Sequence, residues 1–66
     1  MRNRVRELRK LKGLTQEDLA EIIDVSRQTI NAIEKEKFDP SLPTAFKMSK
    51  VFEIPIEDFF LFNEKH

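Results

Sequence analysis

The sequence predicts an all-α domain of five short helices, and two local patterns and the chain length support this class. Thr15, Ser26 and Ser41 each precede apolar residues at helical spacing, so their hydroxyls can cap a helix. Gly13 and Pro40 interrupt the pattern, because glycine accepts left-handed geometry at a helix end and proline cannot continue a helix. With 66 residues the chain has room for one domain and one small core.

The first helix is expected over about Asn3–Lys12, with Val5 and Leu8 facing the core. It ends at Gly13, after which Leu14 fills the core. This arrangement places a basic helix at the start of the domain.

The next two helices are expected over about Gln16–Ile23 and Arg27–Lys35, joined by a tight turn. Thr15 caps the first, whose first turn carries acids at the positive end of the helix dipole, and Ser26 caps the second. The apolar residues of both helices fall on facing stripes: Leu19, Ala20, Ile23, Ile30 and Ile33. Polar side chains of the second helix are therefore left facing solvent.

A fourth helix is expected after Ser41, where Pro43 is tolerated because first-turn N–H groups have no intrahelical partner. Its expected inward face consists of Leu42, Ala45, Phe46, Ser49 and Phe52. The segment Ile54–Phe60 is interpreted as a break followed by a last short helix.

The charge distribution is uneven although the formal net charge is zero. Residues 1–12 carry six basic side chains against Glu7 alone, a balance of +5, and the remainder is at −5. Because counterion release depends on the groups that meet phosphates, a neutral chain with a segregated basic face can still bind DNA. An ordinary solvated helix face is the alternative for each of these side chains.

Composition argues against several other classes of protein. The chain has no cysteine, one glycine and one histidine, the terminal His66, so we expect no disulfide, no metal site, no phosphate loop and no catalytic pair. The domain is too small to enclose a cofactor or a small-molecule effector. No signal peptide or membrane span is apparent, and the reducing cytoplasm is the simplest compartment. We therefore expect neither an enzyme nor a membrane protein.

The segment Thr15–Lys37, with Arg9 before it and Pro40–Leu42 after it, resembles the helix-turn-helix of the Cro/C1-type (Xre) family of DNA-binding regulators. The resemblance covers about residues 5–60. The matching positions are Arg9, Gly13, Gln16, Leu19, Ala20, Val25, Ser26, Ile30, Glu34, Pro40, Ser41 and Leu42. It implies a five-helix, lambda-repressor-like domain that binds double-stranded DNA.

Three exposed side chains of the third helix are predicted to read bases. In the major groove a guanidinium can pair with guanine and an amide with adenine, so we assign these roles to Arg27 and Gln28. Asn31, one turn further on, can reach another base or a phosphate. An ordinary solvated surface is the alternative for each side chain taken alone.

The resemblance further implies phosphate contacts and one structural ion pair. Gln16 begins the second helix, where the family's equivalent residue binds a phosphate and the helix dipole favours an anion. The other phosphate-contact candidates are Thr15, Ser26, Lys35, Lys37 and Phe38. An ion pair between Arg9 and Glu34 is expected to clamp the first helix onto the third.

Two positions depart from the family pattern. Asp24 lies in the turn where glycine is usual, and Glu36 lies where the third helix usually exits through glycine or asparagine. Aspartate tolerates left-handed geometry fairly well. Glutamate does not, so either Glu36 stores about 1 kcal/mol of strain or the loop takes another path, away from the phosphate contacts expected of Lys37 and Phe38.

The end of the chain is expected to form a dimer. No single helical face can bury the four neighbours Phe59–Phe62, so within residues 1–66 we assign about 54–66 to dimerisation. The assigned interface residues are Ile56, Phe59, Phe60, Leu61 and Phe62. The alternative is that these aromatics close the core of a monomer. The resemblance also allows Met1–Asn3 to pair with Leu61–Asn63 as a small two-stranded sheet.

These observations together predict a homodimeric, sequence-specific transcriptional regulator, a repressor that reads an inverted-repeat operator through its third helix. The alternative is an antitoxin-like or adaptor protein that uses a helix-turn-helix scaffold to bind another protein.

Overall fold

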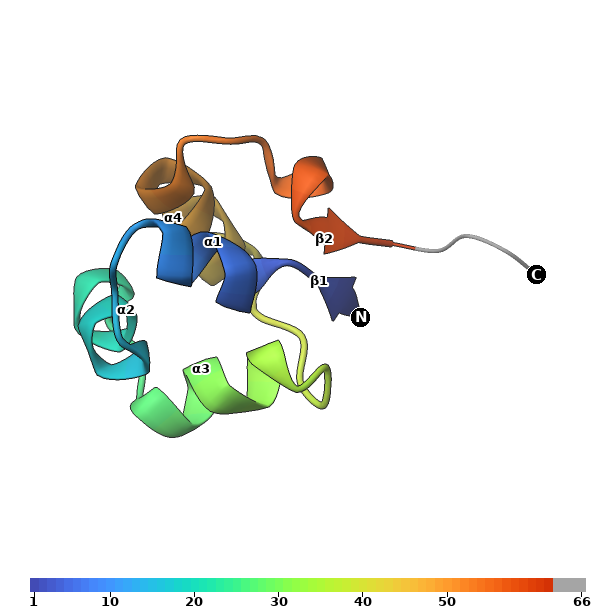
Figure 1. Ribbon diagram of the computed structural model, residues 1–66. Coiled ribbons are helices and arrows are strands. Elements are labelled where there is room, and N and C mark those ends of the chain that lie inside the picture. The colour runs from blue at the N-terminus through green and yellow to red at the C-terminus, as the bar shows by residue number, and fades with distance from the viewer. Residues whose placement is uncertain (63–66) are drawn as a thin grey trace.

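The computed structural model describes residues 1–62, in which four α-helices surround one core (Figure 1). The helices are Val5–Leu11 (α1), Gln16–Ile23 (α2), Arg27–Glu34 (α3) and Leu42–Phe52 (α4). A one-turn 3-10 helix, Ile56–Asp58 (η1), follows α4, and two short antiparallel strands, Arg2–Asn3 (β1) and Phe60–Leu61 (β2), join the two ends of the chain. None of the helices among residues 1–62 is long and apolar enough to cross a membrane.

The last short helix expected within Ile54–Phe60 is a 3-10 helix of three residues, Ile56–Asp58, so a fifth α-helix is not confirmed. Pro55 precedes a single 3-10 turn, in which the N–H of Asp58 donates to Pro55 and the N–H of Phe59 donates to Ile56. The chain then leaves helical geometry because the Arg4 N–H donates to the Phe59 carbonyl at 2.8 Å. The backbone after η1 thus finds its partners in β1, not in a further helical turn.

The expected pairing of the two ends is confirmed, with the C-terminal strand beginning one residue earlier than expected. Arg2 lies opposite Leu61, and Asn3 lies opposite Phe60. Asn63 and the remaining residues of the tail lie outside the described part of the chain. The sheet also shortens α1, which begins after Asn3 and not at it.

Side-chain caps set the starts of three helices, as predicted. The Thr15 hydroxyl accepts from the Asp18 N–H while the Asp18 carboxylate accepts from the Thr15 N–H, both at 3.0 Å. Ser26 and Ser41 cap α3 and α4, each accepting from the N–H three residues on, at 3.1 and 3.3 Å. These local hydrogen bonds fix where α2 and α3 begin.

Helix α4 turns a different face to the core from the one expected. Leu42 and Phe46 are 64% and 55% exposed, whereas Ala45, Met48 and Phe52 are buried. The buried three recur at helical spacing and meet the other helices, so the expected inward roles of Leu42 and Phe46 are wrong. Within residues 1–62 the buried apolar residues are Val5, Leu8, Leu19, Ala20, Ile23, Ile30, Ile33, Ala45, Met48, Phe52, Phe59 and Phe60.

Phe59 and Phe60 belong to the core of the monomer. Phe59 is fully buried and meets Phe52 edge-on, with 5.3 Å between ring centroids, and Phe60 is 6% exposed. Their assignment to a dimer interface is therefore wrong. Both neighbours point inward because the backbone changes from a 3-10 turn to a strand between them, so they do not have to share one helical face. Leu61 and Phe62 remain exposed.

Left-handed backbone ends three of the helices without glycine. Asp24 ends α2 at φ 62°, Glu36 follows α3 at φ 64°, and Glu53 ends α4 at φ 61°. Of the two alternatives for Glu36, strain or a different loop path, the structure thus has the strained left-handed backbone, at a cost of about 1 kcal/mol. Gly13, at φ 72°, adopts the same geometry without that cost.

Candidate nucleic-acid interface

Helix α3 displays the three predicted base-reading side chains away from the core. Arg27 and Gln28 are exposed, and Asn31 is half-buried. Ile30 and Ile33, between and after them, are fully buried. The helix is therefore anchored by its apolar stripe and presents guanidinium and amide groups on its outer face.

Two polar hollows lie beside this face, where α1, the start of α2 and α3 meet. The first, about 380 Å³, is lined by Arg6, Arg9, Gln16, Asn31, Glu34 and Lys35. The second, about 430 Å³, is lined by Arg9, Thr15, Gln16, Glu17 and Arg27. Both include Arg9 and Gln16, so the hollows adjoin and bring together five of the predicted contact residues, Thr15, Gln16, Arg27, Asn31 and Lys35. Gln28, Ser26, Lys37 and Phe38 line neither hollow.

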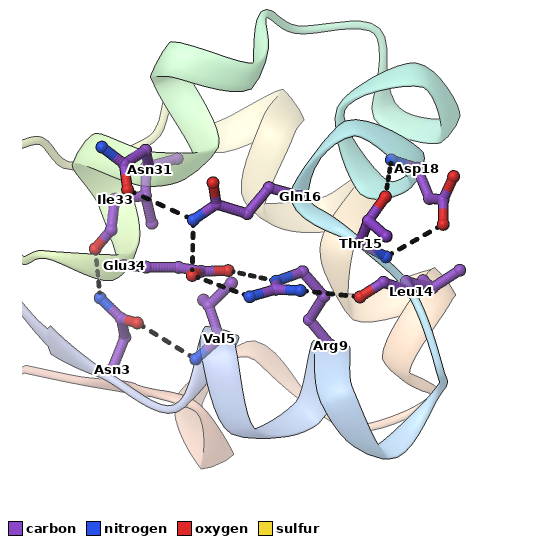
Figure 2. A network of polar contacts seen from close by, with 10 residues as sticks. All are labelled: Asn3, Val5, Arg9, Leu14, Thr15, Gln16, Asp18, Asn31, Ile33 and Glu34. Atoms are coloured by element: carbon purple, nitrogen blue, oxygen red, sulfur yellow. Dashed lines mark hydrogen bonds and ion pairs between the residues drawn. The ribbon is translucent and has the colours of Figure 1, made fainter.

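The expected Arg9–Glu34 ion pair is confirmed and joins α1 to α3 (Figure 2). Arg9 Nε donates to Glu34 Oε2 at 2.6 Å, and Arg9 Nη2 donates to Glu34 Oε1 at 3.3 Å. Arg9 Nη1 also donates to the Leu14 carbonyl at 2.7 Å. The two side chains are only 9% and 4% exposed, so the pair is a structural clamp shielded from water.

Gln16 is drawn into the same network. Its Nε2 donates to Glu34 Oε1 at 3.1 Å and to Asn31 Oδ1 at 3.3 Å (Figure 2). The amide N–H groups predicted to bind phosphate are thus directed at α3. The backbone N–H groups of Gln16 and Glu17, in the first turn of α2, have no intramolecular partner among residues 1–62 and remain for an anion.

The other phosphate-contact candidates are distributed around this region. Thr15 and Lys35 line the hollows, and Lys37 and Phe38 are exposed in the loop after α3. The Lys37 backbone N–H donates to the Ala32 carbonyl at 3.0 Å, so Lys37 can contact a phosphate only through its side-chain ammonium group. Ser26 is exposed, and its hydroxyl already caps α3.

Arg6 was not assigned to the site from the sequence, yet it lines the first hollow together with Lys35. It lies one turn before Arg9 on α1, on the face of the clamp, and this spacing is the signal that could have identified it. The rest of the basic segment is partly neutralised: Arg4 pairs with Glu7 at 3.1 Å, which lowers the pKa of that carboxyl, and Lys12 lies 3.7 Å from Glu53. None of the ion pairs within residues 1–62 involves Arg6, which therefore adds a cation beside α3.

Asn3 is a second residue that the sequence did not reveal. Its Nδ2 donates to the Ile33 carbonyl at 2.9 Å, and its Oδ1 accepts from the Val5 N–H at 3.1 Å (Figure 2). The terminal ammonium of Met1 lies 3.0 Å from Asp39 in the loop after α3. The sheet end of the molecule is thus tied to the C-terminal end of α3 by contacts about 30 residues apart in sequence.

This geometry defines a class of protein. Two short capped helices meet at a left-handed turn, and the second displays amide and guanidinium groups beside hollows lined by cations, which is the arrangement of a helix-turn-helix DNA-binding domain. A family model described as helix-turn-helix matches residues 5–59. The chain belongs to this Cro/C1-type family of DNA-binding transcriptional regulators, which is not a class of enzymes.

Relatives of similar length support this membership. An uncharacterised HTH-type transcriptional regulator of Methanocaldococcus jannaschii is 55% identical over 64 residues, which are 97% of each chain. The HTH-type regulator YgzD of Bacillus subtilis is 46% identical over 66 residues, covering both chains entirely.

Solved structures agree with the fold. The restriction-modification controller protein C.AhdI from Aeromonas hydrophila superposes with a TM-score of 0.77 at 33% identity, over 86% of each chain. The N-terminal DNA-binding domain of SinR from Bacillus subtilis superposes with a TM-score of 0.76 at 31% identity, over 96% of this chain and 90% of that one.

Proposed function

We propose that the chain is a cytoplasmic homodimeric repressor that binds an inverted-repeat operator, with α3 of each copy in the major groove. The observation that carries this proposal is the convergence of Arg27, Gln28 and Asn31 on the outer face of α3, beside hollows lined by cations. Arg27 reads guanine and Gln28 reads adenine, since these side chains match those base edges.

Phosphates on either side of the groove hold α3 in place. The start of α2 receives one phosphate on its free backbone N–H groups. The candidate side chains are Thr15, Ser26, Lys35, Lys37 and Arg6, and Gln16 and Phe38 contribute through their backbones because the Gln16 amide group already donates to Glu34 and Asn31. These groups position the helix and carry no base preference themselves.

Dimerisation uses the end of the molecule where the sheet meets the start of α4, away from the N-terminal end of α3 (Figure 1). A hollow of about 270 Å³ there is lined by Met1, Asp39, Pro40, Leu42, Ala45, Ile56 and Phe60. Leu42 and Phe62, at 64% and 70% exposed, and Leu61, at 38%, supply apolar surface near the ends of these elements. We call Ile56, Leu61, Phe62 and Leu42 the tail surface, and a second copy covers it.

The small DNA-contacting surface of one copy also favours dimerisation. One helix-turn-helix module buries too little surface for tight specific binding, so two half-sites about one DNA turn, or ~34 Å, apart are needed. A twofold axis through the tail surface presents two copies of α3 to such a site.

A protein partner on the tail surface is the second candidate. The observation in its favour is that one solved neighbour is a complex of the SinR and SinI proteins, one chain of which matches with a TM-score of 0.77 at 31% identity. That match covers 96% of this chain and 60% of the other. Under this alternative, DNA binding is weak and unselective.

Selection on a random duplex library at near-physiological salt tests the proposal. The wild-type protein is expected to enrich an inverted repeat, and Gln28→Ala is expected to lose preference at one position in each half-site. Recovery of only unselective, salt-sensitive binding would contradict the proposal and favour the protein partner.

A further inference from the structure

We infer that the polar network under α3 fixes the orientation of the Asn31 amide, so that Asn31 offers hydrogen-bond donors to DNA and selects guanine over adenine. The inference rests on the proposed function, because it requires α3 in the major groove. It assigns a base preference to Asn31, which otherwise could face either a base or a phosphate.

The orientation follows from groups whose hydrogen-bonding character cannot change. Arg9 is only a donor, and it donates through Nε and Nη2 to both oxygens of Glu34. The ionised Glu34 carboxylate is only an acceptor, and its side chain is 4% exposed. Any amide group of Gln16 that faces this carboxylate must therefore be its N–H2 group.

Gln16 passes this constraint on to Asn31. Its Nε2 carries two hydrogens, one for Glu34 Oε1 at 3.1 Å and one for Asn31 Oδ1 at 3.3 Å. Turning the Asn31 amide over would set two N–H2 groups against each other. Asn31 therefore directs its carbonyl oxygen into the network and its own N–H2 group away from it (Figure 2).

The exposed donor determines which base edge is matched. Adenine is read by an amide that donates to N7 and accepts from N6, and this pairing needs both amide groups of Asn31 on the DNA side, whereas its carbonyl oxygen is turned toward Gln16. Guanine presents two acceptors, N7 and O6, to a donor. Thymine offers only O4 beside a methyl group, so guanine is the best match.

Gln28 is the internal contrast on the same helix. Its side chain is exposed, and none of the hydrogen bonds within residues 1–62 involves it. It can present its amide in either orientation and so can read adenine with both groups. The two amides of α3 are thus expected to favour different bases.

Library selection with wild type, Asn31→Ala and Gln16→Ala tests this assignment. The operator position whose preference disappears in Asn31→Ala is expected to be guanine in the wild-type motif, favoured by at least about fivefold. Gln16→Ala is expected to accept adenine at that same position, because the amide of Asn31 is then free to turn. Circular dichroism melting checks folding, and Gln16→Met replaces Gln16→Ala if the latter fails to fold.

A base analogue provides the matched control. Substituting 7-deazaguanine at that position removes the N7 acceptor and is expected to weaken wild-type binding about fivefold while leaving Asn31→Ala unchanged. A wild-type preference for adenine there, a motif that Asn31→Ala leaves intact, or equal analogue losses in both proteins would overturn the inference while the proposed function stands. A wild-type protein that selects no motif would overturn both.

Discussion

Different forces stabilise two regions of the molecule. The first is the reading side, which is the region where α1, the start of α2 and α3 meet, and the second is the end that carries the tail surface. On the reading side, ionised and amide groups of α1, α2 and α3 meet in hydrogen bonds of 2.6–3.3 Å whose donors and acceptors admit one arrangement. At the tail surface, a short sheet and one 3-10 turn bury Phe59 and Phe60 and leave Phe62 exposed. Directional bonds preorganise a surface for specific recognition, whereas apolar contact is non-directional and accommodates a partner.

The largest expected effect is on the clamp of the reading side. Glu34→Gln leaves the buried Arg9 guanidinium without its counter-charge, and we expect a loss of about 3 kcal/mol in the free energy of unfolding, measured by urea denaturation. Glu7→Gln is the matched control, since it breaks the exposed Arg4–Glu7 pair within α1. Equal effects of the two substitutions would show that burial does not distinguish the pairs.

Base recognition is expected to depend on the reading side alone. Arg27→Ala and Gln28→Ala should each reduce discrimination between the selected operator and a scrambled duplex by about tenfold, because each removes a contact to a base edge. Fluorescence anisotropy measures the two affinities, and sedimentation measures self-association, which should not change. Unchanged discrimination would remove that residue from the base-reading set.

Self-association is expected to depend on the tail surface alone. Phe62→Glu should weaken the dimer about tenfold or more, since it places a charge in an apolar interface. Leu11→Glu is the control, because Leu11 is also highly exposed, at 75%, but lies at the end of α1. If the folded Phe62→Glu protein sediments like wild type, the tail surface is not the interface.

A smaller effect is expected at the exit of α3. Glu36→Gly relieves left-handed strain and should stabilise the fold by about 0.5–1 kcal/mol in thermal denaturation. Glu21→Gly, in the exposed interior of α2, should destabilise it by about 1 kcal/mol. If both substitutions destabilise the fold, the backbone at Glu36 is not strained.

The smallest effect concerns pH. Hydrogen bonds from the Thr15 backbone N–H and hydroxyl lower the pKa of Asp18 from its ordinary value of 3.8. Since the carboxylate is favoured in the folded state, its contribution is complete above about pH 5 and is lost as the pH falls through the lowered pKa. The stability of Asp18→Asn should therefore depend less on pH between about 5 and 2.5 than that of wild type. Parallel pH profiles would contradict this account of the cap.

Local signals in the sequence predicted the reading side well. The caps at Thr15 and Ser26 fix the starts of α2 and α3, because each acts within three residues along the chain. The Arg9–Glu34 clamp came from the family resemblance, since nothing local links residues 25 positions apart. The DNA-contacting roles of the exposed side chains remain predictions.

The tail surface was predicted less well because its structure depends on contacts between distant residues. The Arg4 N–H donates to the Phe59 carbonyl, and the residues after Phe59 form a strand where a helix was expected. The Asn3 side chain donates to the Ile33 carbonyl and so joins the strand pair to the end of α3. No regular spacing along the sequence predicts this hydrogen bond. Helical periodicity likewise predicted that Phe46 faces the core, whereas the other helices cover a different face of α4 and leave Phe46 exposed.

The central claim is that the reading side binds DNA while the tail surface joins two copies. Nuclear magnetic resonance of the 15N-labelled protein tests it in one experiment, because amide signals report the contact site residue by residue. Adding the selected duplex is expected to shift signals of Gln16, Arg27, Gln28 and Asn31, and dilution without DNA is expected to shift those of Ile56 and Leu61. Duplex-induced shifts confined to the sheet and the start of α4, with α3 unaffected, would contradict the account.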